Sequence, residues 1–335
     1  MDMAGKTILI TGSTDGVGRY VAKQLAAKGA DVLIHGRDAA RAQPLIEEIV
    51  REGSRAPVFY QADLSSLSGV RQLAKAVRAN RDRLDVFVSN AGIGSRIMGS
   101  AERRESADGF ELRFAVNYLA GFLLADLLLP LLKAAAPSRI VNVASLGQQP
   151  IDFEDVMIAR NYSGGRAYSQ SKLAQIMFTI DLAAELEGSG VTVNALHPAT
   201  YMNTTMVREG GVAPVSTVEQ GGEAILHLIE GDDVANRSGL FFNGLSEAKA
   251  NPQAYDADAR ARLRVLSRKL TGLSHKQRWD VARARGGRVP SADPLPSHLR
   301  QSFHQRLPES EPPSVCTCGR REVDAGVRKG SSHER

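Results

Sequence analysis

The sequence is poor in cysteine and in aromatic residues: two Cys and one Trp occur among 335 residues, and Phe, Trp and Tyr together make up 5%. Both cysteines, Cys316 and Cys318, lie near the C-terminal end. A C-x-C pair cannot supply a disulfide framework, and without further Cys or His partners it is a weak metal signal. We therefore expect neither structural disulfides nor a metal site.

Long hydrophobic runs are also lacking. The most apolar run, residues 122–132, has 11 residues and includes Asp126, whereas a membrane-spanning helix needs about 20 apolar residues. Residues 1–6 lead directly into a strand pattern and do not have the composition of a signal peptide. These absences favour a cytoplasmic protein without a membrane partner.

Basic charge is scarce outside the C-terminal end. Residues 260–335 contain 17 Lys and Arg against 7 Asp and Glu, whereas the preceding residues contain 25 against 30. The net charge of +5 therefore comes from that end. A nucleic-acid partner would have to bind this C-terminal arm alone. We expect no such partner and keep the basic arm as the alternative.

Apolar runs alternate with helical patterns along the chain, which is typical of a parallel sheet covered by helices on both faces. We predict an α/β protein with a Rossmann-type, doubly wound parallel sheet of about seven strands in a single domain. The strands are expected at about 6–10, 30–37, 57–60, 84–89, 139–144, 191–196 and 239–242, and the helices at about 17–28, 39–51, 66–77, 107–135, 166–187, 218–230 and 253–270.

The hydrophobic content of 43% is enough for a substantial core. The periodic pattern ends after about Leu273, and residues 281–335 are rich in Pro, Ser, Arg and Gly. Such composition cannot bury enough apolar surface to fold. We predict one catalytic domain over residues 1–275 and a disordered, dispensable basic tail over residues 276–335.

A glycine-rich turn, residues 11–18, directly follows the first expected strand and leads into a helix. Glycines allow close backbone approach, and a helix N-terminus offers free N–H groups and a positive dipole end. The spacing is G-x-x-x-G-x-G rather than the common G-x-G-x-x-G. The position of the turn after the first strand indicates a site for a dinucleotide pyrophosphate.

Tyr168 and Lys172 are four residues apart on an expected helix, so they share one face of it. A free tyrosine titrates near pH 10, and a neighbouring cation favours the phenolate and lowers that pKa. The pair is therefore a candidate for general acid/base work. In isolation the same spacing is more often a surface pair on an amphipathic helix, and only the rest of the chain decides between the two.

The end of the second expected strand indicates which cofactor is preferred. An acidic residue there binds a ribose 2′-hydroxyl, whereas an Arg accommodates a 2′-phosphate. This sequence has Gly36 and Arg37, so we predict NADP(H). Asp15 in the glycine turn is acidic and Asp38 could pair with Arg37, which leaves NAD(H) as the alternative.

Several motifs occur in a set order along the chain: Thr11-Gly12 with Gly16 and Gly18, Asp63, Asn90-Ala91-Gly92, Asn117, Ser145, and Tyr168 with Lys172. In order and spacing they resemble the short-chain dehydrogenase/reductase family over residues 5–270. The connection over residues 151–164 resembles that of the branch containing retinol dehydrogenases and protochlorophyllide reductases.

The resemblance implies a role for each catalytic candidate. Tyr168 is the acid/base, Ser145 hydrogen-bonds the substrate oxygen, Lys172 holds the nicotinamide ribose and lowers the tyrosine pKa, and Asn117 supports a proton-relay water chain. Implied cofactor contacts are Gly12, Ser13, Asp15, Gly16, Val17, Gly18, Arg37, Asp63, Leu64, Asn90, Ala91, Gly92, Tyr168, Lys172, Pro198 and Thr204.

The chain departs from the family pattern after the sixth strand. Pro198-Ala199 replaces the usual Pro-Gly, and Asn203 stands at the offset of the usual Thr, with Thr204 next. Ala199 lacks the backbone freedom of glycine. We therefore expect the contacts on the nicotinamide side to differ from those of the family.

We predict an NADP(H)-dependent enzyme that interconverts a carbonyl and an alcohol on a small, largely apolar substrate. Tyr201, Met202, Met206 and Val207, in the loop expected over 197–217, indicate the apolar substrate. The alternatives are a C=C reductase and a non-catalytic dinucleotide sensor.

The apolar surfaces of the helix around 122–132 and of the Tyr168 helix predict a homodimer or homotetramer, because the equivalent helices often form an interface in this family. Full burial of both helices inside one subunit is the alternative.

Overall fold

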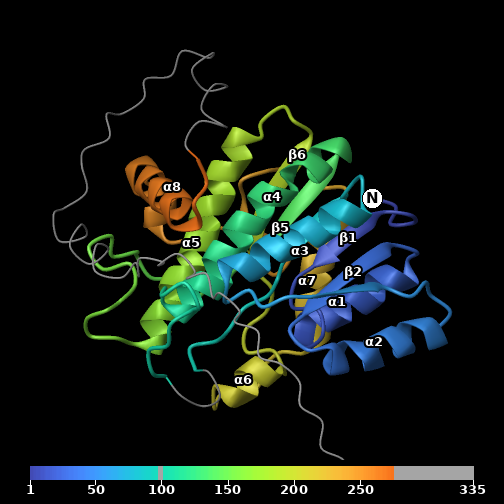
Figure 1. Cartoon of the computed structure of the whole chain (residues 1–335), viewed down its shortest axis with the longest axis horizontal. Helices are drawn as coiled ribbons and strands as arrows, with labels where there is room; N and C mark the ends of the chain where they lie inside the picture. The colour runs from blue at the N-terminus through green and yellow to red at the C-terminus, as the bar shows by residue number, and fades with distance from the viewer. Residues whose placement is uncertain (97–100, 275–335) are drawn as a thin grey trace, which may run out of the picture. The chain divides into compact units, whose positions relative to one another are not determined.

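The computed structural model (Figure 1) describes residues 1–96 and 101–274. The chain divides into two units, Met1–Gln277 and Arg278–Arg335, and all described residues belong to the first. The predicted disordered tail over 276–335 lies outside the described residues and stays a prediction.

Eight strands form one sheet in the order β3-β2-β1-β4-β5-β6-β7-β8 (Figure 1). All neighbouring pairs from β3 to β7 are parallel, and β8 pairs antiparallel with β7. The direction of winding reverses between β1 and β4, which places a ligand crevice at the carboxyl ends of these strands. The strands are β1 Thr7–Ile10, β2 Asp31–Gly36, β3 Val58–Gln61, β4 Val86–Ser89, β5 Ser138–Val143, β6 Val191–His197, β7 Phe241–Asn243 and β8 Ser246–Ala248.

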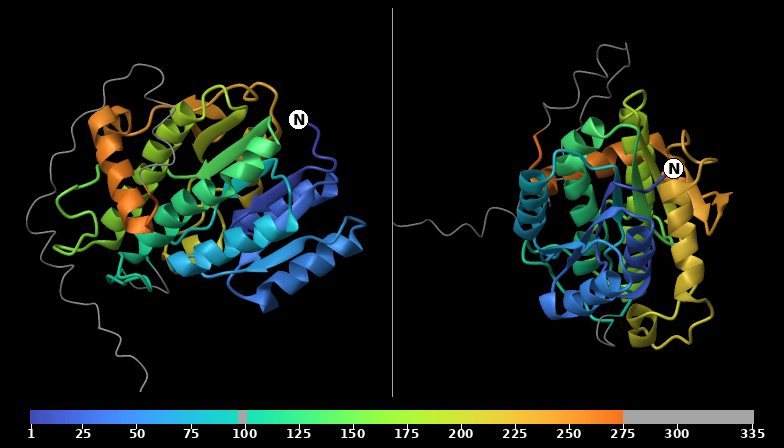
Figure 2. Two further views of the ribbon diagram at one scale, coloured as in Figure 1. Left: turned by 45° about the horizontal axis from the view of Figure 1, so that its top comes forward. Right: turned by 90° about the vertical axis from the view of Figure 1, so that its right-hand side faces the viewer.

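Helices cover both faces of this sheet, and Figure 2 shows α7 and α3 on opposite sides of it. Alternate residues of β1 point into different cores: Ile8 and Ile10 pack with α1, α2 and α7, whereas Leu9 packs with α3 and α4. The helices are α1 Gly16–Ala27, α2 Ala39–Arg51, α3 Leu67–Asn80, η1 Phe114–Leu119, α4 Ala120–Ala134, α5 Gly164–Glu185, α6 Thr205–Glu209, α7 Val218–Glu230, η2 Pro252–Tyr255 and α8 Ala257–Thr271.

Short polar side chains start the main helices. Asp15, Asp38, Ser66 and Ser163 each accept a hydrogen bond from the first turn of α1, α2, α3 and α5. These bonds satisfy N–H groups that a helix leaves without a partner. Because Ser163 caps α5, the chain enters that helix with Tyr168 in its second turn.

The predicted fold class is confirmed, with three differences in the elements. β8 was not predicted because Ser-Glu-Ala has no apolar pattern, and α6 because it has only five residues. The helix expected from residue 107 starts only just before Phe114, since Gly109 at φ +78° and a bridge between Glu105 and Glu111 form a turn first.

The segment Phe114–Ala134 is long and apolar enough, by length and composition, to cross a membrane. Of its most apolar 18-residue window, 72% is buried inside the fold. Leu123, Leu124, Leu128 and Leu132 belong to the core shared with α3 and the sheet. Such burial is what a core helix requires.

Helix α8 packs on η1, α4 and α5 through polar as well as apolar contacts. Tyr118 Oη and Ser267 Oγ form a buried hydrogen bond of 2.7 Å. Asp181 of α5 pairs with both Arg260 and Arg264. Leu263 completes the apolar cluster between α5 and α8. Helix α8, the last helix among the described residues, is therefore an integral part of this unit.

Further basic side chains of α8 also have partners within the chain. Arg262 lies 4.5 Å from the centroid of the Phe153 ring and 3.3 Å from Glu154. Together with the pairs to Asp181, these contacts occupy three of the arginines that made the C-terminal end look basic. The described part of that end therefore lends no support to a nucleic-acid arm.

A first prediction concerns the C-terminal limit of the folded unit. A chain ending at Ser274 should keep its melting temperature, whereas a chain ending at Asn251 loses η2 and α8 and leaves Asp181 and Tyr118 without partners. The shorter chain also loses the apolar burial of Leu263, and losing the burial of such a side chain costs about 1.5–3 kcal/mol, equivalent to a drop of roughly 5–10 °C. Thermal unfolding followed by circular dichroism measures both. A marked drop in the longer chain would mean that the residues after 274 stabilise the fold.

Candidate active site

The glycine-rich turn between β1 and α1 packs directly against the loop after β4. A Cβ on Gly12, which has φ +65°, would lie 2.8 Å from Ala91 Cα. A Cβ on Gly18 would lie 2.5 Å from Asn90 Nδ2. Any side chain at either position would collide with the loop, so glycine is required. The turn therefore presents bare backbone at the crevice, as a pyrophosphate site needs.

Asn90, which follows β4, stabilises this contact through hydrogen bonds. Its amide donates to the carbonyl oxygens of Thr11 at 2.8 Å and Gly12 at 3.1 Å. Thr11 Oγ1 in turn accepts from the N–H groups of Asn90 at 3.0 Å and Ala91 at 3.1 Å. The Asn90 side chain is thus used within the protein, and its predicted contact with a cofactor stays a prediction.

His35, the penultimate residue of β2, is hydrogen-bonded to the glycine-rich turn. Its Nδ1 accepts the Gly12 N–H at 3.1 Å, so the neutral ring carries its proton on Nε2, which donates to the Ala62 carbonyl at 3.2 Å. Burial lowers the pKa of His35 to about 4. Ser13 Oγ accepts the His35 N–H at 2.9 Å, so Ser13 also shapes the turn from inside and its predicted cofactor contact stays a prediction.

In the segments after β1 and β2, both acidic residues that weighed against NADP(H) have other partners. Asp38 caps α2 by accepting the Ala40 N–H at 2.8 Å. Asp15 caps α1 and pairs with Arg41 at 2.8 Å. Among the described residues, no ion pair of Arg37 is found, and its side chain is exposed. The guanidinium is therefore available to a ligand.

Ser145 and Tyr168 meet at the carboxyl end of β5. Ser145 follows β5 and its Oγ accepts the Gly147 N–H at 3.0 Å. The Ser145 hydroxyl also interacts with the Tyr168 phenol. A Cβ on Gly147 would lie 3.4 Å from Ser145 Oγ and 3.7 Å from Tyr168 Cε1. Gly147 therefore keeps the space beside both hydroxyl groups narrow but open.

Lys172 is buried one turn along α5 from Tyr168. Its Nζ donates to the Val143 carbonyl at 2.8 Å and to Gln175 Oε1 at 2.9 Å, and lies 5.8 Å from the centroid of the Tyr168 ring. Burial lowers the pKa of Lys172 to about 7.

The direction expected for the Tyr168 pKa was wrong. Burial raises the pKa of Tyr168, and the interaction with Ser145 only partly opposes that rise. Loss of water around the phenol disfavours its anion. The i,i+4 spacing correctly predicted that Lys172 and Tyr168 are neighbours, but it contained no information on desolvation.

Asn117 lies in η1, a π-helical segment, a conformation that is frequent at functional sites. Its Oδ1 accepts the Ile93 N–H at 2.8 Å, and its Nδ2 donates to the Ile93 carbonyl at 3.1 Å and to Ser171 Oγ at 3.0 Å. A Cβ on Gly92 would lie 3.3 Å from Asn117 Oδ1 and 3.6 Å from Lys172 Nζ. Glycine at position 92 thus keeps the approach between these two groups clear.

The segment after β6 lies against the glycine turn and the loop after β4. A Cβ on Gly16 would lie 3.2 Å from Thr204 Cγ2, and one on Gly94 would lie 3.1 Å from Met206 Cγ. Met202, by contrast, packs on the core near Gly221 of α7. Its expected contact with substrate was therefore wrong, because the apolar pattern did not reveal which side of the loop faces inward.

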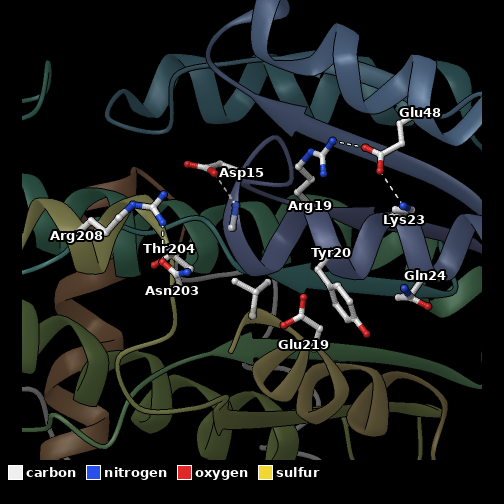
Figure 3. A pocket seen from close by; sticks show the side chains of 12 residues that line it. Asp15, Arg19, Tyr20, Lys23, Gln24, Glu48, Asn203, Thr204, Arg208 and Glu219 are labelled. Carbon is white, nitrogen blue, oxygen red and sulfur yellow. Dashed lines mark hydrogen bonds and ion pairs between the residues drawn. The ribbon is translucent and has the colours of Figure 1, made fainter. Parts of the chain in front are cut away.

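A pocket lies between α1, the segment around Asn203 and Arg208, and the start of α7 (Figure 3). Arg19 and Lys23 both pair with Glu48 of α2 on one wall, and Arg208 donates to Asn203 Oδ1 on the other. The charges on its walls compensate one another.

One buried cluster was missed from the sequence. Arg113 is fully buried, and it donates to the carbonyl oxygens of Gly94 at 2.9 Å and Ser95 at 2.7 Å and to Tyr162 Oη at 2.6 Å. Tyr162 Oη in turn donates to Glu111 at 2.9 Å. The cluster ties the loop after β4 to the segment before α5. The available signal was an Arg between apolar residues at the start of a helix.

The predicted catalytic residues Asn117, Ser145, Tyr168 and Lys172 therefore come together. The predicted cofactor residues form three groups: the turn after β1 (Gly12, Ser13, Asp15, Gly16, Val17, Gly18), the segments after β2, β3 and β4 (Arg37, Asp63, Leu64, Asn90, Ala91, Gly92) and the segment after β6 (Pro198, Thr204). The side chains of Val17 and Leu64 belong to the core. Within the described residues, no cluster of three or more metal-binding side chains occurs.

A second prediction concerns acid sensitivity. The pKa of His35 is about 4 in the folded chain against about 6.5 when unfolded, so the unfolded chain takes up the proton first as the pH falls. This contribution to stability is present above about pH 6.5 and is lost down to about pH 4, by about 3 kcal/mol. His35→Asn keeps an acceptor for Gly12 but does not titrate. Urea unfolding at pH 7 and pH 4.5 should show a smaller loss in this variant, and equal losses would contradict the role of His35.

Comparisons with known proteins agree with this geometry. The short chain dehydrogenase family model matches residues 6–211. Retinol dehydrogenase 13 of Mus musculus is 36% identical over 288 residues, which cover 81% of this chain and 85% of the relative.

Two solved structures are similar to this chain. An uncharacterized protein from Mycobacterium paratuberculosis has a TM-score of 0.67 at 30% identity, covering 81% of this chain and 95% of the other. The RhlG/NADP active-site complex of Pseudomonas aeruginosa has a TM-score of 0.58 at 28% identity, covering 72% and 95%. The chain therefore belongs to the short-chain dehydrogenase family, in a branch like that of the retinol dehydrogenases, and is an NAD(P)-dependent oxidoreductase.

Proposed function

We propose that the protein uses NADP(H) to interconvert a carbonyl and an alcohol on a small, largely apolar substrate. The observation that carries this proposal is the convergence of the Ser145 hydroxyl, the Tyr168 phenol and the buried Lys172 ammonium. These groups can bind and protonate one oxygen atom. A carbonyl oxygen that becomes an alcohol must be both hydrogen-bonded and protonated.

The residues around the crevice fit a dinucleotide. The bare backbone of the turn at Gly12 and Gly18 suits a pyrophosphate, and Lys172 retains an N–H for a ribose hydroxyl. When bound, the nicotinamide supplies or accepts the hydride at the carbonyl carbon. Side chains of the protein carry out all the remaining steps.

In the reduction direction, Ser145 donates a hydrogen bond to the carbonyl oxygen and Tyr168 delivers the proton. The raised pKa of Tyr168 keeps the phenol protonated at neutral pH, which is the form that a proton donor needs. The Lys172 ammonium stabilises the phenolate that is left. Asn117 Oδ1 and Lys172 Nζ both lie near Gly92, so a water chain there would return the proton.

The preference for NADP(H) rests on Arg37 and its neighbours. Asp38 caps a helix and Arg41 neutralises Asp15, so neither carboxylate is free to repel a 2′-phosphate or to neutralise Arg37. A planar guanidinium matches a phosphate group well. Gly36, packed on Thr14, has no side chain to bind a 2′-hydroxyl.

The apolar character of the substrate is supported by exposed side chains around the reactive groups. Leu146 follows Ser145 and is 46% exposed, and Tyr201 and Met206 of the facing segment are 51% and 39% exposed. Tyr201 is close enough to Tyr168 to contribute to the rise in the pKa of that phenol. Exposed apolar side chains next to Ser145 and in the segment after β6 favour a hydrophobic substrate.

We also propose a cytoplasmic location, because a sequence with only two cysteines suits a reducing compartment. For the assembly, we propose the alternative to the predicted oligomer, which is burial of both helices inside one subunit. Helix α8 covers part of α4 and α5 with Leu263 and the Asp181 ion pairs, which favours burial within one subunit over a homodimer or homotetramer. No feature of the site favours C=C reduction, which remains the alternative reaction.

A third prediction tests the proton donor. Tyr168→Phe keeps the ring and removes the hydroxyl, so kcat should fall by roughly 100-fold or more while NADPH binding changes little. Steady-state kinetics and fluorescence titration measure the two quantities. Tyr255→Phe, at an exposed tyrosine of η2, is the matched control. Near-normal turnover of Tyr168→Phe would rule out the mechanism.

A fourth prediction tests the cofactor preference. A charge-assisted contact to a phosphate contributes about 1.5–3 kcal/mol, so kcat/KM for NADPH should exceed that for NADH by roughly ten- to a hundredfold. Arg37→Ala should remove most of this difference by raising the KM for NADPH alone. Arg55→Ala removes an equal charge near Asp31, at the other end of β2, and should have no effect. Equal use of both cofactors by the unmodified protein would refute the assignment.

A further inference from the structure

Lys172 is held by two acceptors, and only one of them is backbone. The Val143 carbonyl belongs to β5 and cannot be altered by substitution, whereas Gln175 Oε1, at 2.9 Å, is a side chain one turn further along α5. Positions i and i+3 share a helix face. Gln175 is itself buried, with 3% of its surface exposed. The contact is therefore shielded from water.

An ammonium group has three N–H donors in a tetrahedral arrangement. Two of them point to Val143 and Gln175, so the direction of the third is determined. A Cβ on Gly92 would lie 3.6 Å from Nζ, which places the approach to Lys172 on the side of Gly92 and Asn117. Without Gln175 the ammonium could rotate, and its remaining donor would lose this fixed direction.

We propose that Gln175 is a positioning residue, whose amide oxygen fixes the Lys172 ammonium so that one N–H stays directed at the cofactor crevice. The inference rests on the proposed function, because it assigns Lys172 to the cofactor ribose. Gln175 is suited to this task because it is a neutral acceptor. It holds the ammonium without neutralising it, so the positive charge remains for an anionic dinucleotide.

Because Gln175 is neutral, it does not raise the pKa of Lys172 as a carboxylate would. Burial lowers the Lys172 pKa to about 7, and no carboxylate opposes that effect. A carboxylate within hydrogen-bond distance raises the pKa of a cation by about 1–3 units. Gln175→Glu would therefore keep the acceptor oxygen and move the titration to higher pH.

Two other titratable groups face Lys172. His197 of β6 has its pKa lowered by burial and by Lys172 itself, so it titrates below its ordinary value near 6.5. Tyr168 on α5 has its pKa raised above 10. Lys172 is thus the member of this group that titrates between pH 7 and pH 10, and a change in that window reports on it.

The test is NADPH binding to the substrate-free protein, measured by fluorescence from pH 6 to pH 10. In the unmodified protein the Kd should increase as the pH rises through about 7, because the ammonium is lost. In Gln175→Glu this increase should shift upward by about 1–3 pH units. In Gln175→Leu, which removes the acceptor, the Kd should already be raised roughly tenfold at pH 7.

Two control variants make the result decisive. Gln170→Leu removes another buried glutamine of α5 that is not a hydrogen-bond partner of Lys172, and it should leave the pH profile unchanged. Lys172→Met should abolish the increase near pH 7. If the increase persists there, the role of Lys172 in the proposed function is wrong. If Lys172→Met abolishes it but Gln175→Glu does not shift it, the proposal for Gln175 is overturned.

Discussion

Desolvation of one ammonium group is the constraint on which the catalytic end of this protein depends. Burying a cation is costly unless hydrogen bonds replace its water. Lys172 meets this need with one backbone and one side-chain oxygen. These acceptors come from β5 and from α5 itself, so the ammonium links the catalytic helix to the sheet. Any movement of α5 relative to β5 would break a bond that water cannot replace.

The turn after β1, proposed above to bind the cofactor pyrophosphate, likewise depends on hydrogen bonds that replace water, here at backbone groups. The turn after β1 contains N–H and carbonyl groups that no regular element satisfies. Asn90, after β4, donates to the Thr11 and Gly12 carbonyl oxygens of this turn, and His35 of β2 accepts its Gly12 N–H. Because these strands meet at the point where the winding of the sheet reverses, the crevice is lined by groups whose positions the sheet determines. The glycines are required by this close packing as much as by the ligand.

The sequence was sufficient to predict the fold and the pairing of Tyr168 with Lys172, because buried strands and i,i+4 spacing leave a direct pattern in the residues. The place of Ser145 beside them was implied by the resemblance to the family. Features that depend on three-dimensional burial were not predictable in this way. The Tyr168 pKa rises because its surroundings exclude water, and Met202 points into the core rather than toward substrate. Gln175 and Arg113 are polar residues within apolar helices, and the pattern alone could not reveal what they bind.

The two buried bases at opposite ends of the crevice require opposite protonation states. His35 must be neutral so that Nδ1 can accept the Gly12 N–H, and this holds above its pKa of about 4. Lys172 must be charged so that Nζ can donate a hydrogen bond and attract an anionic dinucleotide, and this holds below its pKa of about 7 in the ligand-free chain. Burial lowers both pKa values. The same desolvation therefore widens the pH range in which His35 is neutral and the turn is intact, and it narrows the pH range in which Lys172 is charged. A bound anion favours the ammonium form and raises its pKa. Cofactor binding would therefore extend the upper limit of this range, and the site would function at neutral pH because its ligand completes its electrostatics.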